Sequence, residues 1–271
     1  MLPVRALAAF RTDPDLTLLV DRRALRLDEV AAAGLVIEIV MDLPGDAAKA
    51  YVLRGQGSNP MLATLTLSDR ARYMRLMDRF YVPISPDAAV VSAFFDLIAD
   101  IYDGLIHHSV NLETARSLLS TVLETAPPSP RILDFGCGTG LAREALRDLG
   151  IGKTAHIVGT DLSVEMLRHA AERGETVLTI EKWRADRSTY DGAIACFVLH
   201  YGVPNLDLVR IANSLAPGGR FAANFFKAGD SDIRRLVDLM SDAGLRLIRH
   251  TSAVSTSTSE NPMLVFERPL C

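Results

Sequence analysis

The sequence lacks most of the features that would mark a secreted, metal-binding or membrane-spanning protein. Its 271 residues include three cysteines, which show neither the spacing of a metal site nor the even number of a disulfide framework. No apolar run reaches the roughly 18–20 residues that a membrane helix needs. The apolar start of the chain, Met1–Phe10, is shorter than the core of a signal peptide. We therefore expect a soluble, cytoplasmic protein that holds no metal and does not span a membrane.

A surplus of basic residues is also missing. The chain has 29 Lys and Arg against 33 Asp and Glu, a formal net charge of −4 and a pI near 5.9. A protein that binds a phosphate backbone over a wide face is usually basic. The acidic balance therefore argues against long nucleic acid as a partner and leaves room only for a local basic groove. Hydrophobic residues make up 49% of the chain, which is enough to bury a sizeable core.

The first of three zones, residues 1–80, has the pattern of a small α+β unit. It contains short β-branched or apolar runs separated by Gly, Pro, Asn and Asp, which is typical of strands. Ala71, Met74 and Met77 recur at helical spacing, so a short helix is predicted at Ser68–Phe80. The predicted strands are Leu16–Val20, Leu35–Met41, Ala50–Arg54 and Met61–Leu67.

The second zone, residues 81–130, shows two apolar stripes at helical spacing, and the third zone, residues 131–271, alternates strands with helices. Such alternation predicts a doubly wound, mostly parallel sheet with helices on both faces. The last two strands have no clear helix between them and are expected to pair antiparallel. The seven predicted strands are Arg131–Phe135, His156–Thr160, Thr176–Ile180, Gly192–Leu199, Arg220–Phe226, Leu245–Arg249 and Met263–Glu267.

A glycine-rich turn at a strand-to-helix junction carries the functional signal. Asp134–Gly140 (DFGCGTG) follows the first strand of the third zone, and the helix after it aims free N–H groups at a bound ligand. Open α/β sheets bind ligands at this edge, where the strand order reverses. Asp161, at the end of the next strand, can accept hydrogen bonds from both hydroxyls of a ribose. The turn reads Gly-x-Gly-x-Gly, whereas a dinucleotide site would have Gly-x-Gly-x-x-Gly.

Four segments, in order, resemble the motif set of class I S-adenosylmethionine (SAM)-dependent methyltransferases, and of small-molecule methyltransferases in particular. They are ILDFGCGTG, VGTDLSVEML, YDGAIACFVLHYG and LAPGGRF, and the resemblance covers about residues 85–267. It implies a Rossmann-like, seven-stranded sheet with the last strand antiparallel. It also implies SAM as cofactor and S-adenosylhomocysteine as product, bound by residues 131–271.

The same resemblance implies a set of cofactor-binding residues. Asp134 and the glycines would hold the methionine part of SAM, and Asp161 the ribose hydroxyls. Phe197 and Val198 would face the sulfonium. The family usually places an acidic residue after the third strand, and here both Glu181 and Asp186 are candidates, with Glu181 preferred. The implied set is Tyr102, Asp134, Phe135, Gly136, Cys137, Gly138, Thr139, Gly140, Asp161, Leu162, Met166, Glu181, Lys182, Trp183, Phe197 and Val198.

His200 and Tyr201 form the candidate catalytic pair, because they follow the fourth strand of the sheet, which points at the ligand crevice. An imidazole there could take a proton from a substrate hydroxyl or amine. The alternative is a histidine that is packed or faces solvent. Cys196 lies within an apolar strand, so we expect a buried, inert thiol there.

The expected activity is methyl transfer to a small-molecule acceptor, with residues 81–130 as the lid or wall of its pocket. The chain has no Asn/Asp-Pro-Pro-aromatic run and no Pro-Cys pair, which mark methylation of nucleic-acid bases. Three alternatives remain. The first is a protein or RNA methyltransferase that recognises its substrate through residues 1–80. The second is a SAM-fold binding or assembly protein without methyl transfer, and the third is an enzyme that uses SAM for a reaction of another kind. Residues 1–80 could also mediate a homodimer.

Overall fold

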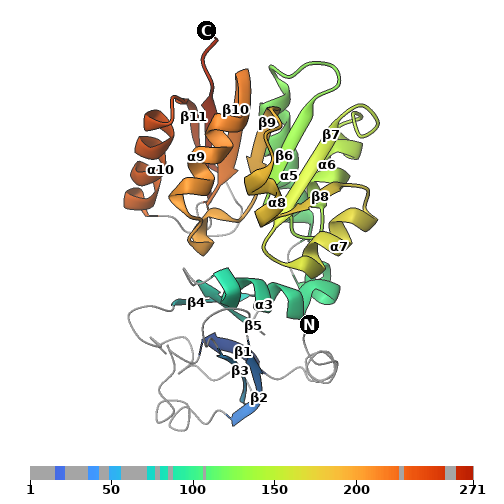
Figure 1. Cartoon of the computed structure of the whole chain (residues 1–271), viewed down its shortest axis with the longest axis vertical. Helices are drawn as coiled ribbons and strands as arrows, with labels where there is room; N and C mark the ends of the chain where they lie inside the picture. The colour runs from blue at the N-terminus through green and yellow to red at the C-terminus, as the bar shows by residue number, and fades with distance from the viewer. Residues whose placement is uncertain are drawn as a thin grey trace. The chain divides into compact units, whose positions relative to one another are not determined.

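The computed structural model of the chain is shown in Figure 1 and divides into two compact units, Met1–Ile106 and His107–Cys271. The structure describes residues 16–21, 36–42, 49–55, 72–76, 80–84, 88–105, 108–225, 229–253 and 261–270.

The first unit contains a five-stranded sheet in the order β2-β3-β1-β5-β4, in which the β1–β5 pair is parallel and the others are antiparallel. Its elements are β1 (Leu16–Asp21), β2 (Val36–Asp42), β3 (Lys49–Gly55), β4 (Arg72–Leu76), β5 (Phe80–Ile84), α3 (Ala88–Ile98), the 3₁₀ turn η3 (Ala99–Ile101) and α4 (Tyr102–Leu105).

Three of the four strands predicted for this unit are confirmed, because β1, β2 and β3 cover the runs at 16–20, 35–41 and 50–54. The predicted strand at 61–67 lies outside the described residues. The predicted helix at Ser68–Phe80 is wrong. Residues Arg72–Leu76 instead form β4 and pair antiparallel with β5, from Arg72 opposite Ile84 to Leu76 opposite Phe80. The five residues of β4, RYMRL, are too few for their spacing to decide between helix and strand, and pairing with the next strand decides it.

The second unit is built on a seven-stranded sheet in the order β11-β12-β10-β9-β6-β7-β8. All neighbouring strands are parallel except that β12 is antiparallel to both β10 and β11, as predicted. The strand order reverses between β6 and β9, which makes the carboxyl end of β6 the ligand-binding edge of such a sheet. The strands are β6 (Arg131–Phe135), β7 (His156–Asp161), β8 (Thr176–Thr179), β9 (Tyr190–Ala195), β10 (Leu215–Asn224), β11 (Arg246–Ala253) and β12 (Asn261–Glu267).

Helices cover both faces of this sheet (Figure 1). Successive residues of one strand enter different cores: Ile132 packs in the cluster that includes Leu118 of α5, whereas Leu133 packs in the cluster that includes Leu208 of α9. This alternation is the pleat of a strand buried on both sides. The helices are α5 (His108–Leu123), α6 (Leu141–Asp148), α7 (Val164–Glu172), α8 (Ile180–Ala185), α9 (Asn205–Ser214), α10 (Asp230–Asp242) and the 3₁₀ turn η4 (Leu199–Tyr201).

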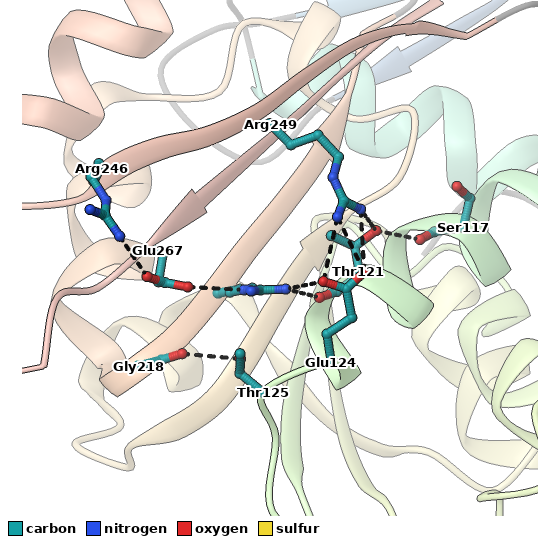
Figure 2. Close-up of polar contacts among 9 residues, drawn as sticks. Ser117, Thr121, Glu124, Thr125, Gly218, Arg246, Arg249 and Glu267 are labelled. Carbon is teal, nitrogen blue, oxygen red and sulfur yellow. Dashed lines mark hydrogen bonds and ion pairs between the residues drawn. The ribbon is translucent and has the colours of Figure 1, made fainter.

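The end of α5 is tied to the strands β10–β12 by a network of charged side chains (Figure 2). Glu124 accepts hydrogen bonds from Arg220 at 2.6 Å and from Arg249 at 3.3 Å. Arg220 also reaches the carbonyl oxygen of Thr121 at 2.9 Å and the carboxylate of Glu267 at 3.2 Å. Arg220 is only 12% exposed, so its charge depends on these partners. The network fixes α5 against the sheet whose edge carries the candidate site.

Candidate cofactor and active site

The glycine turn after β6 is fastened to the end of β7. The backbone N–H groups of Gly136 and Cys137 donate to the carbonyl oxygen of Thr160, at 2.7 and 3.1 Å. Gly136, Gly138 and Gly140 all have left-handed backbones, with φ of +72°, +53° and +86°. Residues other than glycine rarely adopt that backbone conformation. The turn therefore needs glycine at all three positions and begins α6 directly at Gly140.

Space around the turn differs from one glycine to the next. A Cβ on Gly136 would lie 2.1 Å from Cγ2 of Val198, and a Cβ on Gly140 would lie 2.9 Å from Cα of Ala170. A Cβ on Gly138 would have no heavy atom of the described part of the chain within 4 Å. The two outer glycines thus allow close packing of the turn against its neighbours, and the middle one leaves an open place above it.

Asp161 brings the two predicted motifs into direct contact. Its Oδ2 accepts the backbone N–H of Gly138 at 2.9 Å, and its Oδ1 accepts the backbone N–H of Ser163 at 2.9 Å. Ser163 in turn caps α7, because its Oγ accepts the N–H of Met166 at 3.1 Å. The carboxylate at the end of β7 and the turn after β6 therefore form one polar surface.

Asp134, at the end of β6, is almost fully buried below this surface, at 3% exposed. Burial, and then the charge of Asp161, raise the pKa of Asp134 to about 7. Two carboxyl groups so close resist joint ionisation. A cation placed beside them would stabilise both negative charges.

Two residues near the turn were missed at the level of sequence. Glu175, directly before β8, is 6% exposed and reaches Gly140 and Gly159. Asn224, at the end of β10, is 1% exposed, and its Oδ1 accepts the backbone N–H of Phe197 at 2.8 Å. Phe197 itself has a left-handed backbone with φ of +54°. A sharp bend therefore follows β9 and turns Val198 onto Gly136.

The candidate catalytic pair lies in η4, just after this bend. The rings of His200 and Tyr201 are tilted by 42° with centroids 4.1 Å apart. Burial lowers the pKa of His200 to about 4, so its imidazole is neutral at neutral pH. Cys196, before the bend, has its pKa raised by burial and by the charge of Asp134. Its thiol stays protonated, in line with the expected inert cysteine.

The residues of α8 separate into buried and exposed groups. Trp183 is 1% exposed and packs edge-on against Phe135 with ring centroids 5.2 Å apart. Glu181 and Lys182 are exposed in the first turn of the same helix. Asp186 lies elsewhere: its carboxylate accepts the hydroxyl of Tyr190 at 3.0 Å, at the start of β9 and so at the opposite edge of the sheet from the glycine turn.

The remaining predicted residues are distributed around the turn and in the first unit. Leu162 is half-buried beside the main core, and Met166 is buried at 1% exposed. Thr139 accepts a hydrogen bond from the guanidinium of Arg173 at 3.3 Å. Tyr102 belongs to the first unit, where its ring meets Phe95 edge-on at 6.0 Å.

Within the described part of the chain, no group of three or more His, Cys, Asp or Glu is arranged to hold a metal ion. Nor does any helix in the described ranges have the length and apolar character needed to cross a membrane.

Comparison with known proteins agrees with this geometry. Residues 132–219 match the methyltransferase domain family. The malonyl-[acyl-carrier protein] O-methyltransferase of Alcanivorax borkumensis is 34% identical over 143 residues, which are 49% of this chain and 46% of that protein. The ribosomal protein L11 methyltransferase of Burkholderia mallei is 26% identical over 50% of this chain and 45% of its own. The chain thus spans about half the length of these relatives.

A solved structure shows the same fold. The magnesium protoporphyrin IX methyltransferase of Synechocystis PCC 6803, with bound SAM, superposes with a TM-score of 0.52 at 18% identity, over 67% of this chain and 97% of that one. The sheet order, the antiparallel last strand and the match over residues 132–219 define the class. The chain contains a class I SAM-dependent methyltransferase domain with a Rossmann-like fold.

Proposed function

We propose that this protein binds SAM and transfers its methyl group to a small-molecule acceptor. The observation that carries the proposal is the contact between Gly138 and Asp161, which joins a glycine turn and a carboxylate at the strand-order reversal. This is the place where open α/β sheets bind their ligands. The relatives named above are methyltransferases, which supports the same reaction class.

The chemistry of Asp161 fits a nucleoside. An ionised carboxylate offers about four lone-pair positions. Gly138 and Ser163 each donate to one of its oxygens, and each oxygen can accept more than one hydrogen bond, so the same carboxylate can also bind the paired hydroxyls of a ribose. The place above Gly138, where a Cβ would meet no atom of the described residues within 4 Å, fits the close approach of the cofactor chain.

The methionine part of SAM would lie near Asp134. Its amino group and its sulfonium are both cationic, and a cation favours the ionised form of a carboxyl group whose pKa is raised to about 7. The place of Asp186 at the far edge of the sheet supports Glu181 as the acidic residue that meets the adenine.

Methyl transfer from a sulfonium is an in-line displacement from a leaving group that is already activated. The chain's main contribution is to hold the nucleophile and the methyl group close and collinear, which can be worth on the order of 7–11 kcal/mol. His200 is neutral above pH about 4 and can accept a proton, although as a weak base. It therefore suits an acceptor with an acidic proton better than an alcohol or an amine.

Isothermal titration with SAM and with S-adenosylhomocysteine tests the cofactor site. We expect both to bind, and Asp161→Ala to weaken binding at least about tenfold, because charge-assisted hydrogen bonds contribute about 1.5–3 kcal/mol. Asp148→Ala, at the exposed end of α6, is the matched control and should bind normally. Absence of binding by the folded wild-type protein would end the proposal.

The acceptor is tested separately. Incubation with methyl-labelled SAM and a bacterial metabolite extract, followed by mass spectrometry, should place the label in a small molecule. A protein acceptor is the second candidate, because one relative is a ribosomal protein methyltransferase. Label in the macromolecular fraction would favour it. SAM binding with no labelled product in either fraction would instead favour a binding or assembly protein that keeps the fold.

A further inference from the structure

Glu175 is a buried carboxyl group beneath the glycine turn, and the proposed methyl transfer gives it no role. Its side chain is 6% exposed. A Cβ on Gly159 would lie 2.4 Å from its Oε2, and a Cβ on Gly140 would lie 3.4 Å from its Cδ. The carboxyl group therefore fills the space beside Gly159, where a Cβ could not fit, and lies in packing contact with Gly140 of the turn.

The groups that face Glu175 come from every element around the turn. Burial raises the pKa of Glu175 well above its ordinary value, and the charge of Asp134 on β6 raises it further. The backbone N–H and guanidinium of Arg143 on α6, together with Arg173 at the end of α7, act in the opposite direction. Cys137, whose Sγ lies beside Glu175 around Gly159, is a thiol whose pKa is raised by burial. On balance the surroundings of Glu175 favour its protonated form.

The location of this carboxyl group also matters for α6. The residue at the N-terminal cap of α6 is Gly140, which has no side chain to satisfy the free N–H groups of the first turn. Glu175, directly before β8 and 32 positions after Arg143, lies beside Gly140 at the start of that turn. The N–H of Arg143 itself donates to the carbonyl oxygen of Gly140 at 3.2 Å, so the contribution of Glu175 is to pack against the turn.

We propose that Glu175 is a positioning residue of the glycine turn, a buried side chain that holds Gly140 and the start of α6 in the shape that receives the cofactor. The inference rests on the proposed SAM site, since it assigns a supporting role to the same turn. Glu175 acts through the turn and makes no contact with the reacting atoms.

Three variants of the full-length protein test the role. Glu175→Gln keeps the shape of the side chain and is always neutral. Glu175→Ala removes the side chain. Glu172→Ala changes an exposed glutamate on α7, 58% exposed, and serves as the control. The affinity for S-adenosylhomocysteine is measured by titration from pH 6 to pH 10, with circular dichroism at each pH to confirm that the protein is folded.

We expect Glu175→Gln to bind as tightly as wild type at neutral pH, and Glu175→Ala to bind about tenfold more weakly, because the cavity that it leaves lets the turn relax. As the pH rises, Glu175 in the wild type ionises beside Asp134, so wild-type affinity should fall more than that of Glu175→Gln. The titration of the ligand affects both proteins alike, so the ratio of the two affinities reports on Glu175 and on the carboxyl group of Asp134 that its charge affects. A residue with a merely structural role would leave this ratio constant.

Two results would overturn the inference: a ratio that does not change across the pH series, or wild-type affinity in folded Glu175→Ala. If Glu175→Ala does not fold, the pH series with Glu175→Gln decides alone. Hydrogen exchange of residues 138–145 without ligand separates this inference from the proposed function. Faster exchange in Glu175→Ala, in a protein whose wild type binds no S-adenosylhomocysteine, would keep the positioning role and reject the SAM site.

Discussion

The backbone N–H of Phe197 donates a hydrogen bond to Oδ1 of Asn224 across 2.8 Å, from the end of β9 to the end of β10. Because that N–H needs an acceptor, the bond sets which way the Asn224 amide points. Phe197 is thereby held in a left-handed backbone, φ +54°, which a bulky residue adopts at a cost of about 1–3 kcal/mol. The strained backbone of Phe197 lies at the edge of the sheet where methyl transfer is proposed.

The first prediction concerns this pair. Asn224→Leu should destabilise the wild type more than it destabilises Phe197→Gly, because glycine can relax and find another partner for its N–H. We expect a coupling of about 1 kcal/mol or more in a double-mutant cycle measured by urea unfolding. Asn213→Ala, an exposed residue of α9, should be additive with Phe197→Gly. Additivity of Asn224→Leu with Phe197→Gly would show that the hydrogen bond does not maintain the bend.

The second prediction compares two glycines of the turn. Alanine at either Gly136 or Gly138 must adopt a left-handed backbone, at about 1–2 kcal/mol. At Gly136 the new Cβ would also lie 2.1 Å from Cγ2 of Val198, whereas at Gly138 it would meet no atom of the described residues within 4 Å. Gly136→Ala should therefore lower the free energy of unfolding by roughly 1–3 kcal/mol more than Gly138→Ala. Equal losses in the free energy of unfolding, measured with urea, would mean that the Val198 side chain moves aside without a cost in stability.

The third prediction follows from His200. Its pKa is lowered by burial from 6.5 in the unfolded chain to about 4 in the folded protein. The folded state is therefore favoured above pH 6.5 and loses stability as the pH falls from 6.5 towards 4, by at most about 3 kcal/mol. His200→Leu should remove this part of the acid sensitivity. The comparison is the midpoint of urea unfolding at pH 4.5 and pH 7.

The control for this third measurement is His250→Gln, an exposed histidine on β11. It should leave the acid sensitivity of the wild type as it is. If His200→Leu loses as much stability on acidification as the wild type does, then His200 is not buried as a neutral imidazole.

The fourth prediction concerns the network of Figure 2. Glu124→Ala removes a carboxylate shared by Arg220 and Arg249 and should cost about 1–2 kcal/mol, since Arg220 is left with fewer partners. Glu113→Ala, whose 78% exposed carboxylate pairs with Arg116 on the surface, should cost under about 0.5 kcal/mol. Thermal unfolding at neutral pH measures both.

The same pair of variants has a pH signature. Hydrogen bonding to Arg220 lowers the pKa of Glu124 below 4.5. The stability that Glu124 contributes is thus present above pH 4.5 and lost as the pH falls further. The wild type and Glu124→Ala should therefore converge in stability on strong acidification. If the difference in stability between the two proteins stayed constant with pH, the loss in Glu124→Ala would come from packing and not from charge.

Much of the second unit follows from local sequence. The bounds of β6 coincide with the predicted Arg131–Phe135, because proline precedes the strand and a glycine turn follows it. The contact of the turn with Asp161 was also expected, since successive parallel strands end at one edge of the sheet. Gly244, with φ of +82°, follows the end of α10, a position where glycine commonly ends a helix.

Other features depend on contacts between distant segments. The helix α8 has six residues, too few for a periodic pattern, although Thr179 caps it through its hydroxyl. Glu175 follows Gly174 and precedes a strand, a place where a charged residue usually faces water. The burial of Glu175 depends on β7 and α6, and the residues next to it in the sequence do not predict that burial. Asn224 is equally ordinary in sequence and matters only because β9 bends beside it.

The attachment of α5 to the sheet determines where a recombinant version of the methyltransferase unit should begin. The recognisable domain begins at residue 132, yet Leu118, Leu119 and Val122 of α5 are completely shielded from solvent by strands that come after it. A recombinant fragment starting at Arg131 would expose the apolar sheet residues that pack against this helix and would deprive Arg220 of Glu124, one of its two carboxylate partners. Expression vectors for this unit should therefore open ahead of His108, in front of the helix.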